Sequence, residues 1–388
     1  MRPSPALRLF LSLLPAAIAT RPFLNEPDTA IEDVLGDTPE GTLPDLTSML
    51  GLPDFEWAAR RYLNASSYTY YRNGAAGEWS YRNNLEVYGR FRFRPRVMVD
   101  ITQVEASLPT TILGHNFSAP FYISPCARAG LAHPDAEANF VQAAHDEHIL
   151  YIPALYATLS MDEIAAAKPA ADAQVLFQQV YLDSNDTATQ QIFNDAERLG
   201  ARAIVWTIDS AADGNRLRAD RYGVGSADST YTLVTWEVYA KLREMTALPI
   251  VLKGIQSVED VKLAVRHQVP AIILSNHGGR QLDSSPSPLE VALEAYQEDP
   301  DLFNQIEIYA DGGVRYGADV LKLLALGVKA VGLGRSFMYA NAYGAEGVQR
   351  AIQLLKREIA IDAANLGVPD LKKIDASVVK WANNGWFS

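Results

Sequence analysis

The residues with the clearest chemical potential lie in one short stretch, positions 275–283, which reads Ser-Asn-His-Gly-Gly-Arg-Gln-Leu-Asp. It follows an apolar run, residues 270–274, that we interpret as a buried strand. His277 can move a proton near neutral pH, and Arg280 can hold a carboxylate through two hydrogen bonds. The two glycines between them let the backbone approach a ligand closely. The stretch predicts proton transfer beside capture of a small organic acid, and a polar turn with a solvated arginine is the alternative.

These side chains need a scaffold, and from residue 119 onward short apolar runs alternate with helical patterns. The runs are rich in β-branched residues, as in parallel strands buried on both faces. This alternation predicts an α/β fold, a (β/α)8 TIM barrel with an N-terminal helical extension, and a doubly wound open sheet is the alternative. Gly332-x-Gly334 is no dinucleotide fingerprint, because Phe337 stands where glycine or alanine is needed. The eight predicted strands are residues 120–124, 150–154, 175–180, 203–209, 249–253, 271–275, 307–311 and 330–334.

The chain before the barrel divides into three parts. Residues 1–19 join a basic start to a short apolar run and a small-x-small end, which predicts a secretory signal peptide. Residues 20–50 are rich in Pro, Asp, Thr and Gly and read as a linker or arm. Residues 51–388 form the predicted enzyme domain, beginning with a helical pattern over 52–71 and a strand-like segment at 96–100. We therefore expect a secreted protein or one of the secretory pathway, without a membrane span after cleavage.

Composition narrows the possible partners. The chain has 388 residues, 48% of them hydrophobic, and a formal net charge of −12, so a nucleic acid or an anionic membrane is not the expected partner. A single cysteine, Cys126, excludes an internal disulfide and a multi-thiolate metal site, and we expect no metal. Three Asn-x-Ser/Thr sequons, at Asn64, Asn116 and Asn185, are compatible with a secreted glycoprotein.

In a barrel of this kind, the working residues lie at the C-terminal ends of the strands. Polar residues gather there, although each could be a structural cap. The glycine-rich segments after the last two strands are followed by Arg315 and Arg335, which is where such barrels bind a phosphate. An active site with a phosphate-bearing ligand is therefore predicted. The residues at these strand ends are Pro125, Cys126, Ala127, Gln179, Tyr181, Thr207, Asp209, Lys253, Ser275, His277, Asp311, Gly312, Gly313, Gly334 and Arg335.

With these residues placed, the sequence resembles the FMN-dependent α-hydroxy acid oxidases and dehydrogenases, such as glycolate oxidase and lactate oxidase. The stretch 275–283 matches the family's signature almost letter for letter. The resemblance extends from about residue 50 to residue 360 and implies the barrel and an FMN cofactor. Other matching segments are residues 68–71, 93–96, 110–114, 132–134, 248–254 and 311–315.

The resemblance also implies a role for each matching residue. His277 would be the base that takes a proton from the substrate, and Asp209 would pair with it and favour its protonated form. Lys253 would lie by the flavin and stabilise its anionic reduced ring. Tyr181 and Lys253 would complete the catalytic set. The substrate would be held by Tyr68, Tyr181, Arg216 and Arg280. FMN would be bound by Pro125, Cys126, Ala127, Gln179, Thr207, Lys253, Ser275, Asp311, Gly312, Gly313, Arg315, Gly334 and Arg335.

The expected reaction is oxidation of an L-2-hydroxy acid to a 2-oxo acid, with electrons passing to FMN and then to oxygen, giving hydrogen peroxide, or to another separate acceptor. Three departures from the family pattern, Cys126, Ala154 and Tyr156, bear on the usual substrate rather than on the cofactor. A larger, specialised hydroxy acid is therefore an alternative substrate, and a secreted flavin-binding protein without turnover is the alternative function. Relatives of this kind imply a homotetramer.

Overall fold

The computed structural model describes residues 29–169, 174–182, 185–225 and 232–381. By their contacts the residues divide into two units, Met1–Asp37 and Thr38–Ser388. The first unit holds the short helix α1 (Ile31–Leu35). The predicted signal peptide lies outside the described residues. The predicted arm, residues 20–50, spans both units.

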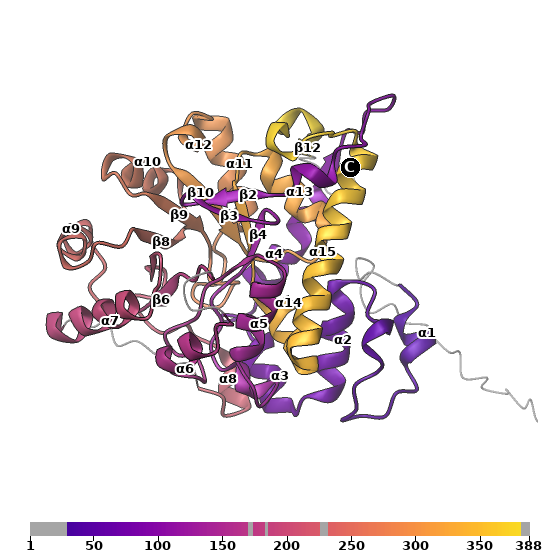
Figure 1. Ribbon diagram of the computed structural model, residues 1–388, viewed down its shortest axis with the longest axis horizontal. Coiled ribbons are helices and arrows are strands. Elements are labelled where there is room, and N and C mark those ends of the chain that lie inside the picture. The colour runs from indigo at the N-terminus through magenta and orange to yellow at the C-terminus, as the bar shows by residue number, and fades with distance from the viewer. Residues whose placement is uncertain (1–28, 170–173, 183–184, 226–231, 382–388) are drawn as a thin grey trace, which may run out of the picture. The chain divides into compact units, whose positions relative to one another are not determined.

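Eight parallel strands form the central sheet of the larger unit (Figure 1), in the order β5-β4-β11-β10-β9-β8-β7-β6. The two end strands meet, because Tyr151 pairs with Leu176 and the Gln179 amide donates to the Pro153 carbonyl at 3.0 Å. The ring is closed, which confirms the predicted barrel over the open sheet. All eight predicted strands are present: β4 (Phe121–Ile123), β5 (Leu150–Tyr151), β6 (Gln178–Val180), β7 (Ile204–Thr207), β8 (Ile250–Ile255), β9 (Ala271–Leu274), β10 (Glu307–Asp311) and β11 (Ala330–Leu333).

The helices that connect these strands begin where the sequence supplies caps. Ser160, Ser257 and Ser287 each accept a hydrogen bond from the amide three residues on, as N-cap serines do. The long helix α15 packs against α5 and α13. The helices are α5 (Ala138–Asp146), α6 (Met161–Ala166), α7 (Asp186–Arg198), α8 (Leu217–Arg221), α9 (Trp236–Met245), α10 (Val258–Arg266), α11 (Pro288–Glu298), α12 (Leu302–Gln305), α13 (Gly317–Ala325), α14 (Arg335–Ala340) and α15 (Gly344–Leu366).

The N-terminal extension is helical, as predicted, but the helix expected over 52–71 is two helices, α2 (Leu52–Tyr62) and α3 (Ala65–Arg72). The break falls where Asn64 caps α3 by accepting a hydrogen bond from the Ser67 amide at 2.9 Å. A third helix, α4 (Trp79–Glu86), follows a turn. The cap at Asn64 therefore stops one helical run and starts the next.

Two short antiparallel pairs were not predicted from the sequence. The hairpin of β2 (Thr110–Ile112) and β3 (His115–Phe117) places Ile112 and Phe117 in the same buried cluster as the barrel interior. Its Leu113 amide donates to Glu307, the first residue of β10, so the hairpin covers the N-terminal end of the barrel. β1 (Phe91–Phe93) pairs with β12 (Val379–Trp381).

The strand expected at residues 96–100 is absent from the described structure, and this prediction is wrong. Val97 and Met98 are 83% and 100% exposed, and Met98 has a positive φ of 60°, which is incompatible with an extended strand.

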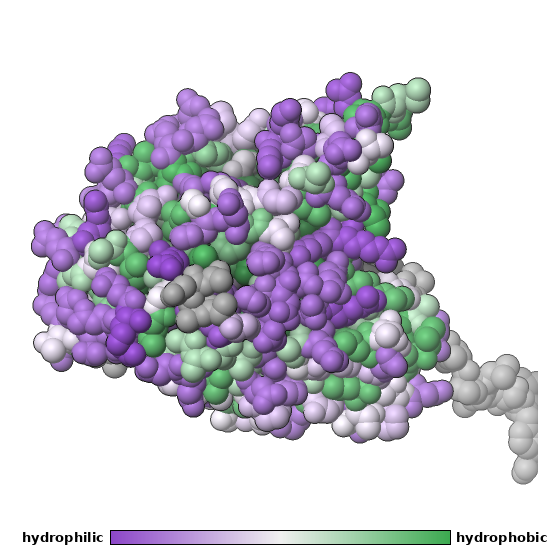
Figure 2. Space-filling view, viewed as in Figure 1, coloured by the Kyte–Doolittle hydropathy of each residue, from purple (hydrophilic) through white to green (hydrophobic). Residues whose placement is uncertain are grey.

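In the view of Figure 2, hydrophilic residues cover much of the face and hydrophobic residues lie scattered between them. Within the described ranges, no helix is long and apolar enough to cross a bilayer.

Candidate active site

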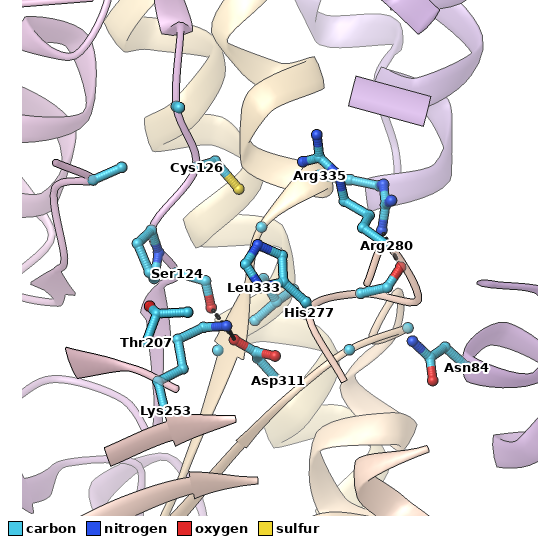
Figure 3. A pocket seen from close by; sticks show the side chains of 18 of the residues that line it. Asn84, Ser124, Cys126, Thr207, Lys253, His277, Arg280, Asp311, Leu333 and Arg335 are labelled. Carbon is cyan, nitrogen blue, oxygen red and sulfur yellow. Dashed lines mark hydrogen bonds and ion pairs between the residues drawn. The ribbon is translucent and has the colours of Figure 1, made fainter. Parts of the chain in front are cut away.

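A pocket opens at the C-terminal ends of the barrel strands (Figure 3). Each of the eight strands contributes a side chain to its lining, either from its last residues or from the residues that directly follow. The hairpin closes the opposite end of the barrel, so this is the working face that the sequence predicted. The contributing residues, in strand order from β4 to β11, are Ser124, Ala154, Gln179, Thr207, Lys253, His277, Asp311 and Leu333.

His277 and Asp209 form a partly buried pair. The Nδ1 atom of His277 lies 2.7 Å from Oδ1 of Asp209, whose side chain has no exposed surface. Burial lowers the pKa of His277, and the charges of Lys253 and Arg216 act in the same direction, while Asp209 opposes them. Asp209 thus favours the protonated imidazole, as expected, but burial outweighs it. The resting His277 is neutral and suited to accept a proton.

The tautomer of His277 follows from its two contacts. Asp209 stays ionised: burial alone would raise its pKa, but His277 and Lys253 reverse this and lower it. An ionised carboxylate only accepts hydrogen bonds, so the imidazole proton lies on Nδ1. The lone pair of Nε2 then points toward the hydroxyl of Tyr181, at 3.4 Å. The basic nitrogen therefore faces the pocket.

Two glycines allow this arrangement. Gly254, at the end of β8, has a φ of 115°, and a methyl group on it would lie 2.6 Å from Cβ of Asp209. Gly279 has a φ of 73°, and its added methyl group would lie 2.5 Å from the backbone nitrogen of Tyr81. Any larger residue would clash at either position, so Gly254 is required by close packing against Asp209, and Gly279 is required by close packing of the His277 loop against α4.

Lys253 is held in place by Ser275 and Asp311. Its ammonium donates to Ser275 at 3.0 Å and lies 3.6 Å from Asp311, which also accepts hydrogen bonds from Ser275 at 2.6 Å and from Ser124 at 3.4 Å. Figure 3 shows Ser124 and Lys253 pointing toward Asp311. Burial alone would lower the pKa of Lys253, but Asp311 and Asp209 raise it, so the ammonium stays charged. A fixed positive charge therefore lies in the lining of the pocket.

Of the predicted residues, Asp209, Ser275 and Tyr68 do not line the pocket. Asp209 and Ser275 lie behind it and act on His277, Lys253 and Asp311. Tyr68 is a different case. Its ring stacks on the ring of Tyr339, with 5.9 Å between the two ring centres, whereas Tyr70 lines the pocket. Side chains two positions apart in a helix point to nearly opposite sides, so α3 can present only one of these tyrosines to the pocket.

Arg216 and Arg280 lie in the pocket, as predicted. Arg216 is 8% exposed and donates to the Arg280 carbonyl at 3.1 Å and to the side chain of Gln281. The guanidinium of Arg280 lies 5.5 Å from the centre of the Tyr70 ring, and its Nε has no hydrogen-bond partner among the described residues. A buried donor without a partner is costly unless a ligand accepts from it. The pair is arranged to receive an anion.

Arg335 lies beside Arg280 and joins three segments (Figure 3). It donates to the carbonyls of Tyr71, Asn73 and Gly278 at 2.7, 2.7 and 2.9 Å. Gly313 packs so tightly that an added methyl group would lie 1.8 Å from the Asn84 carbonyl oxygen. The pocket of this acidic protein is thus strongly basic, with one carboxylate in its lining, that of Asp311. The basic side chains in the lining are Arg216, Lys253, Arg280, Arg315 and Arg335.

Sequence reasoning missed several lining residues from the N-terminal extension. Asn84 exchanges hydrogen bonds with Asn276 at 2.8 and 2.9 Å, so α4 is fixed to the loop that carries His277. Tyr70 and Tyr81 also line the pocket. The aromatic stretch at residues 68–71 gave a signal for Tyr70, but Asn84 had none. Among the described residues, no cluster of His, Cys, Asp and Glu could hold a metal ion.

A family model described as FMN-dependent dehydrogenase matches residues 59–232 and 225–381. The chain is 37% identical over 355 residues to an L-lactate dehydrogenase (cytochrome) of Wickerhamomyces anomalus, covering 85% of this chain and 61% of that protein. It therefore spans less than two thirds of that relative. It is 32% identical over 368 residues to 2-hydroxyacid oxidase 1 of Homo sapiens, covering 86% of this chain and 97% of that protein.

Solved structures agree with the fold. The recombinant flavin-binding domain of baker's yeast flavocytochrome b2 superposes with a TM-score of 0.82 at 36% identity, covering 87% of this chain and 88% of that one. A mandelate oxidase variant with (S)-mandelic acid superposes with a TM-score of 0.78 at 32% identity, covering 85% and 98%.

Proposed function

The chain belongs to the FMN-dependent dehydrogenase family, and from that premise we propose that it oxidises an L-2-hydroxy acid to a 2-oxo acid and passes the electrons to oxygen, giving hydrogen peroxide. FMN is its cofactor. The observation that carries the proposal is the pairing of a neutral His277 with Asp209 in a pocket that also holds Arg216 and Arg280.

The residues present fit FMN. A phosphate needs fixed positive charge and close backbone approach, and Arg315, Arg335 and the tightly packed Gly313 offer both. Asp311 would accept from the ribityl hydroxyls. The backbone and side chains of Pro125, Cys126, Ala127, Gln179 and Thr207, all in the lining, would border the ring. Ser275 would act indirectly, by holding Lys253 and Asp311.

When bound, FMN supplies an acceptor for two electrons. The chain's own residues do the rest. Arg216 and Arg280 would hold the substrate carboxylate, and the Nε2 atom of His277 would take a proton from the substrate. Asp209 then stabilises the imidazolium that forms. Tyr181, 3.4 Å from Nε2, would orient the substrate hydroxyl, and Tyr70, which lines the pocket, would make the substrate contact that the sequence analysis assigned to Tyr68.

Two lining residues bear on the size of the substrate. Tyr156 is 43% exposed, and its ring stacks on that of Tyr181 with 5.4 Å between the ring centres. Ala154, a small residue, also lines the pocket. We propose a hydroxy acid with a bulky or apolar side chain as the second candidate substrate class. Relative turnover of lactate, glycolate and longer or aromatic 2-hydroxy acids distinguishes the two, since a small-substrate enzyme would turn over glycolate or lactate fastest.

The electron acceptor is tested by supplying oxygen and, in parallel, an added cytochrome or dye. Oxygen consumption with matching peroxide formation is expected. Reduction of an added cytochrome or dye at a rate that far exceeds oxygen consumption would replace oxygen with a separate acceptor.

We also propose that the protein is secreted and glycosylated, on the basis of residues 1–19 and the three sequons. Asn64, Asn116 and Asn185 are all exposed. Removal of N-glycans should increase the electrophoretic mobility of the protein recovered from the medium of its native host. We further propose a homotetramer, which sedimentation would test.

A further inference from the structure

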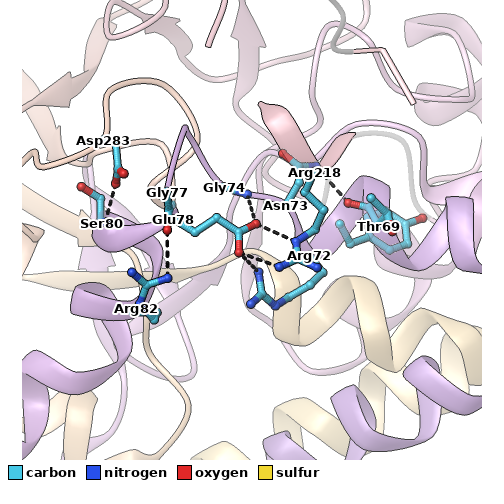
Figure 4. Close-up of polar contacts among 12 residues, drawn as sticks. Thr69, Arg72, Asn73, Gly74, Gly77, Glu78, Ser80, Arg82, Arg218 and Asp283 are labelled. Atoms are coloured by element: carbon cyan, nitrogen blue, oxygen red, sulfur yellow. Dashed lines mark hydrogen bonds and ion pairs between the residues drawn. The ribbon is translucent and has the colours of Figure 1, made fainter. Parts of the chain in front are cut away.

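A buried carboxylate outside the pocket has an unusual set of partners (Figure 4). Glu78 is 7% exposed and lies at the N-terminus of α4 with a φ of 60°. Its two oxygens accept from Nε and Nη2 of Arg218 at 2.7 and 2.8 Å, from Arg72 at 3.2 Å and from the Gly74 amide at 3.1 Å. The bond with Arg218 is bidentate, the geometry that fixes an arginine most firmly.

Arg218 lies two residues after Arg216, on the five-residue helix α8. A helix this short is not stable by itself and takes its position from its contacts. Arg216, the N-cap residue, lines the pocket, whereas Arg218 binds Glu78, and neither of these two residues lines the pocket. The bond to Glu78 therefore fixes the start of the helix from outside, at the point where Arg216 leaves it.

The turn before Glu78 connects the same loops through its backbone. The Ala76 amide donates to the Asn215 carbonyl at 2.7 Å, directly before Arg216. The Ala75 amide donates to the Gly279 carbonyl at 2.8 Å, directly before Arg280. One turn thus spans the two segments that present the substrate arginines, and Glu78 is its only buried charge among the described residues.

We propose that Glu78 is a positioning residue for substrate capture, which holds Arg216 toward the substrate carboxylate through its ion pair with Arg218. This inference rests on the proposed function, because it assigns Arg216 to the substrate.

The charge on Glu78 is present at every working pH. Burial alone would raise its pKa, but the hydrogen bonds and charges of Arg218 and Arg72 lower it to about 2. Arg218 is 42% exposed at its side chain, so it can be replaced without opening the core. The pair is therefore accessible to a clean mutational test.

The main variant is Arg218→Gln, with Arg218→Lys as the conservative replacement and Glu78→Gln as the second route to the same loss. Arg198→Gln is the matched control, because Arg198 makes a similar paired bond to Asp162, at 2.9 and 3.3 Å, outside the pocket lining. FMN content and melting temperature are recorded for each holoenzyme. The readouts are KM, kcat and the Kd of a 2-oxo acid, measured from the change that it causes in the flavin spectrum.

We expect Arg218→Gln and Glu78→Gln to raise KM and the Kd of the 2-oxo acid about 10-fold or more, with a much smaller change in kcat, since losing one charged hydrogen bond to the carboxylate costs about 10-fold or more in affinity. Arg218→Lys should recover part of the loss, and Arg198→Gln should leave all three values unchanged. In an Arg216→Lys background, Arg218→Gln should add less than about a twofold effect, because coupled residues are not additive.

Unchanged Kd and KM in Arg218→Gln and Glu78→Gln would overturn the inference, as would an undiminished effect of Arg218→Gln in the Arg216→Lys background. Equal losses of kcat and FMN content without a change in Kd would also overturn it, since they would indicate general structural damage. Binding of the 2-oxo acid needs no turnover. A wild-type flavin that no hydroxy acid reduces would therefore refute the proposed reaction, while the comparison of Kd values would still decide the inference.

Discussion

Two neighbouring arginines of the pocket are held differently. Arg335 donates to three backbone carbonyls and ties α3 and the His277 loop together. Arg280 lies beside it (Figure 3), donates to the carbonyl of Tyr70, and keeps a buried Nε without a partner among the described residues. One guanidinium is part of the scaffold, and the other has a donor left for a ligand. The difference supports assigning the exchanging substrate to Arg280 and the cofactor phosphate to the segment of Gly313 and Arg315, which we call the substrate end and the phosphate end of the pocket.

The largest difference between the two ends of the pocket should come from His277→Gln, which should slow the reaction and leave FMN binding unchanged. Loss of the base should slow reduction of the flavin by substrate about 10²- to 10⁴-fold. FMN content should stay at the wild-type level, because His277 is no part of the phosphate end. Anaerobic stopped-flow absorbance measures the rate. Undiminished reduction would contradict the assignment of His277 as the base.

Arg280→Lys should weaken carboxylate binding about 10- to 100-fold, because a charged hydrogen bond with fixed geometry is worth about 1.5–3 kcal/mol. The Kd of a 2-oxo acid measures this. The bound FMN should be unaffected, and co-loss of FMN would show that the two ends are not separate.

Arg315→Gln is the converse change. Arg315 lines the pocket next to the tightly packed Gly313, and its loss should raise the Kd of FMN about 10-fold, a typical cost for one charged contact. The rate of reduction per bound FMN should stay close to that of the wild type. Fluorescence of released FMN reports the affinity, and a fall in the rate without loss of FMN would move Arg315 to the substrate end.

The smallest effect concerns pH. Since burial lowers the pKa of His277 in the folded protein, kcat/KM should rise with pH through a midpoint below the ordinary value of about 6.5 and then level off. Folding lowers the pKa of His277, so between the folded and the unfolded pKa the folded state binds fewer protons at this residue. Stability should therefore fall as the pH drops below about 6.5 toward the folded pKa. In His277→Gln both dependences should weaken, as a pH series of melting temperatures would show.

The barrel was predictable because its strands are buried on both faces and read as short apolar runs, such as residues 271–275. The loop with His277 and Arg280 was predictable for a related reason, since polar residues at a strand end lie on the working face. The strands and the His277 loop were predictable because residues close to them in sequence determine their surroundings.

The missed features depend on distant parts of the chain. Tyr68 and Tyr70 are both aromatic, and only the placement of α3 against α14 decides which one reaches the pocket. β1 and β12 are far apart in sequence, so neither strand has a local signal for its partner. Glu78 looks like a surface acid in the sequence, and its burial appears only when α8 brings Arg218 to it.

The central claim is that the pocket binds a 2-hydroxy acid by its carboxylate and oxidises it. Its most direct test is the absorption spectrum of the purified holoenzyme before and after anaerobic addition of L-lactate, glycolate and longer 2-hydroxy acids. We expect flavin bands that bleach with at least one of these acids and not with the corresponding alcohols, which lack the carboxylate. Flavin bands that no hydroxy acid bleaches, or that an alcohol without a carboxylate bleaches equally well, would contradict this claim.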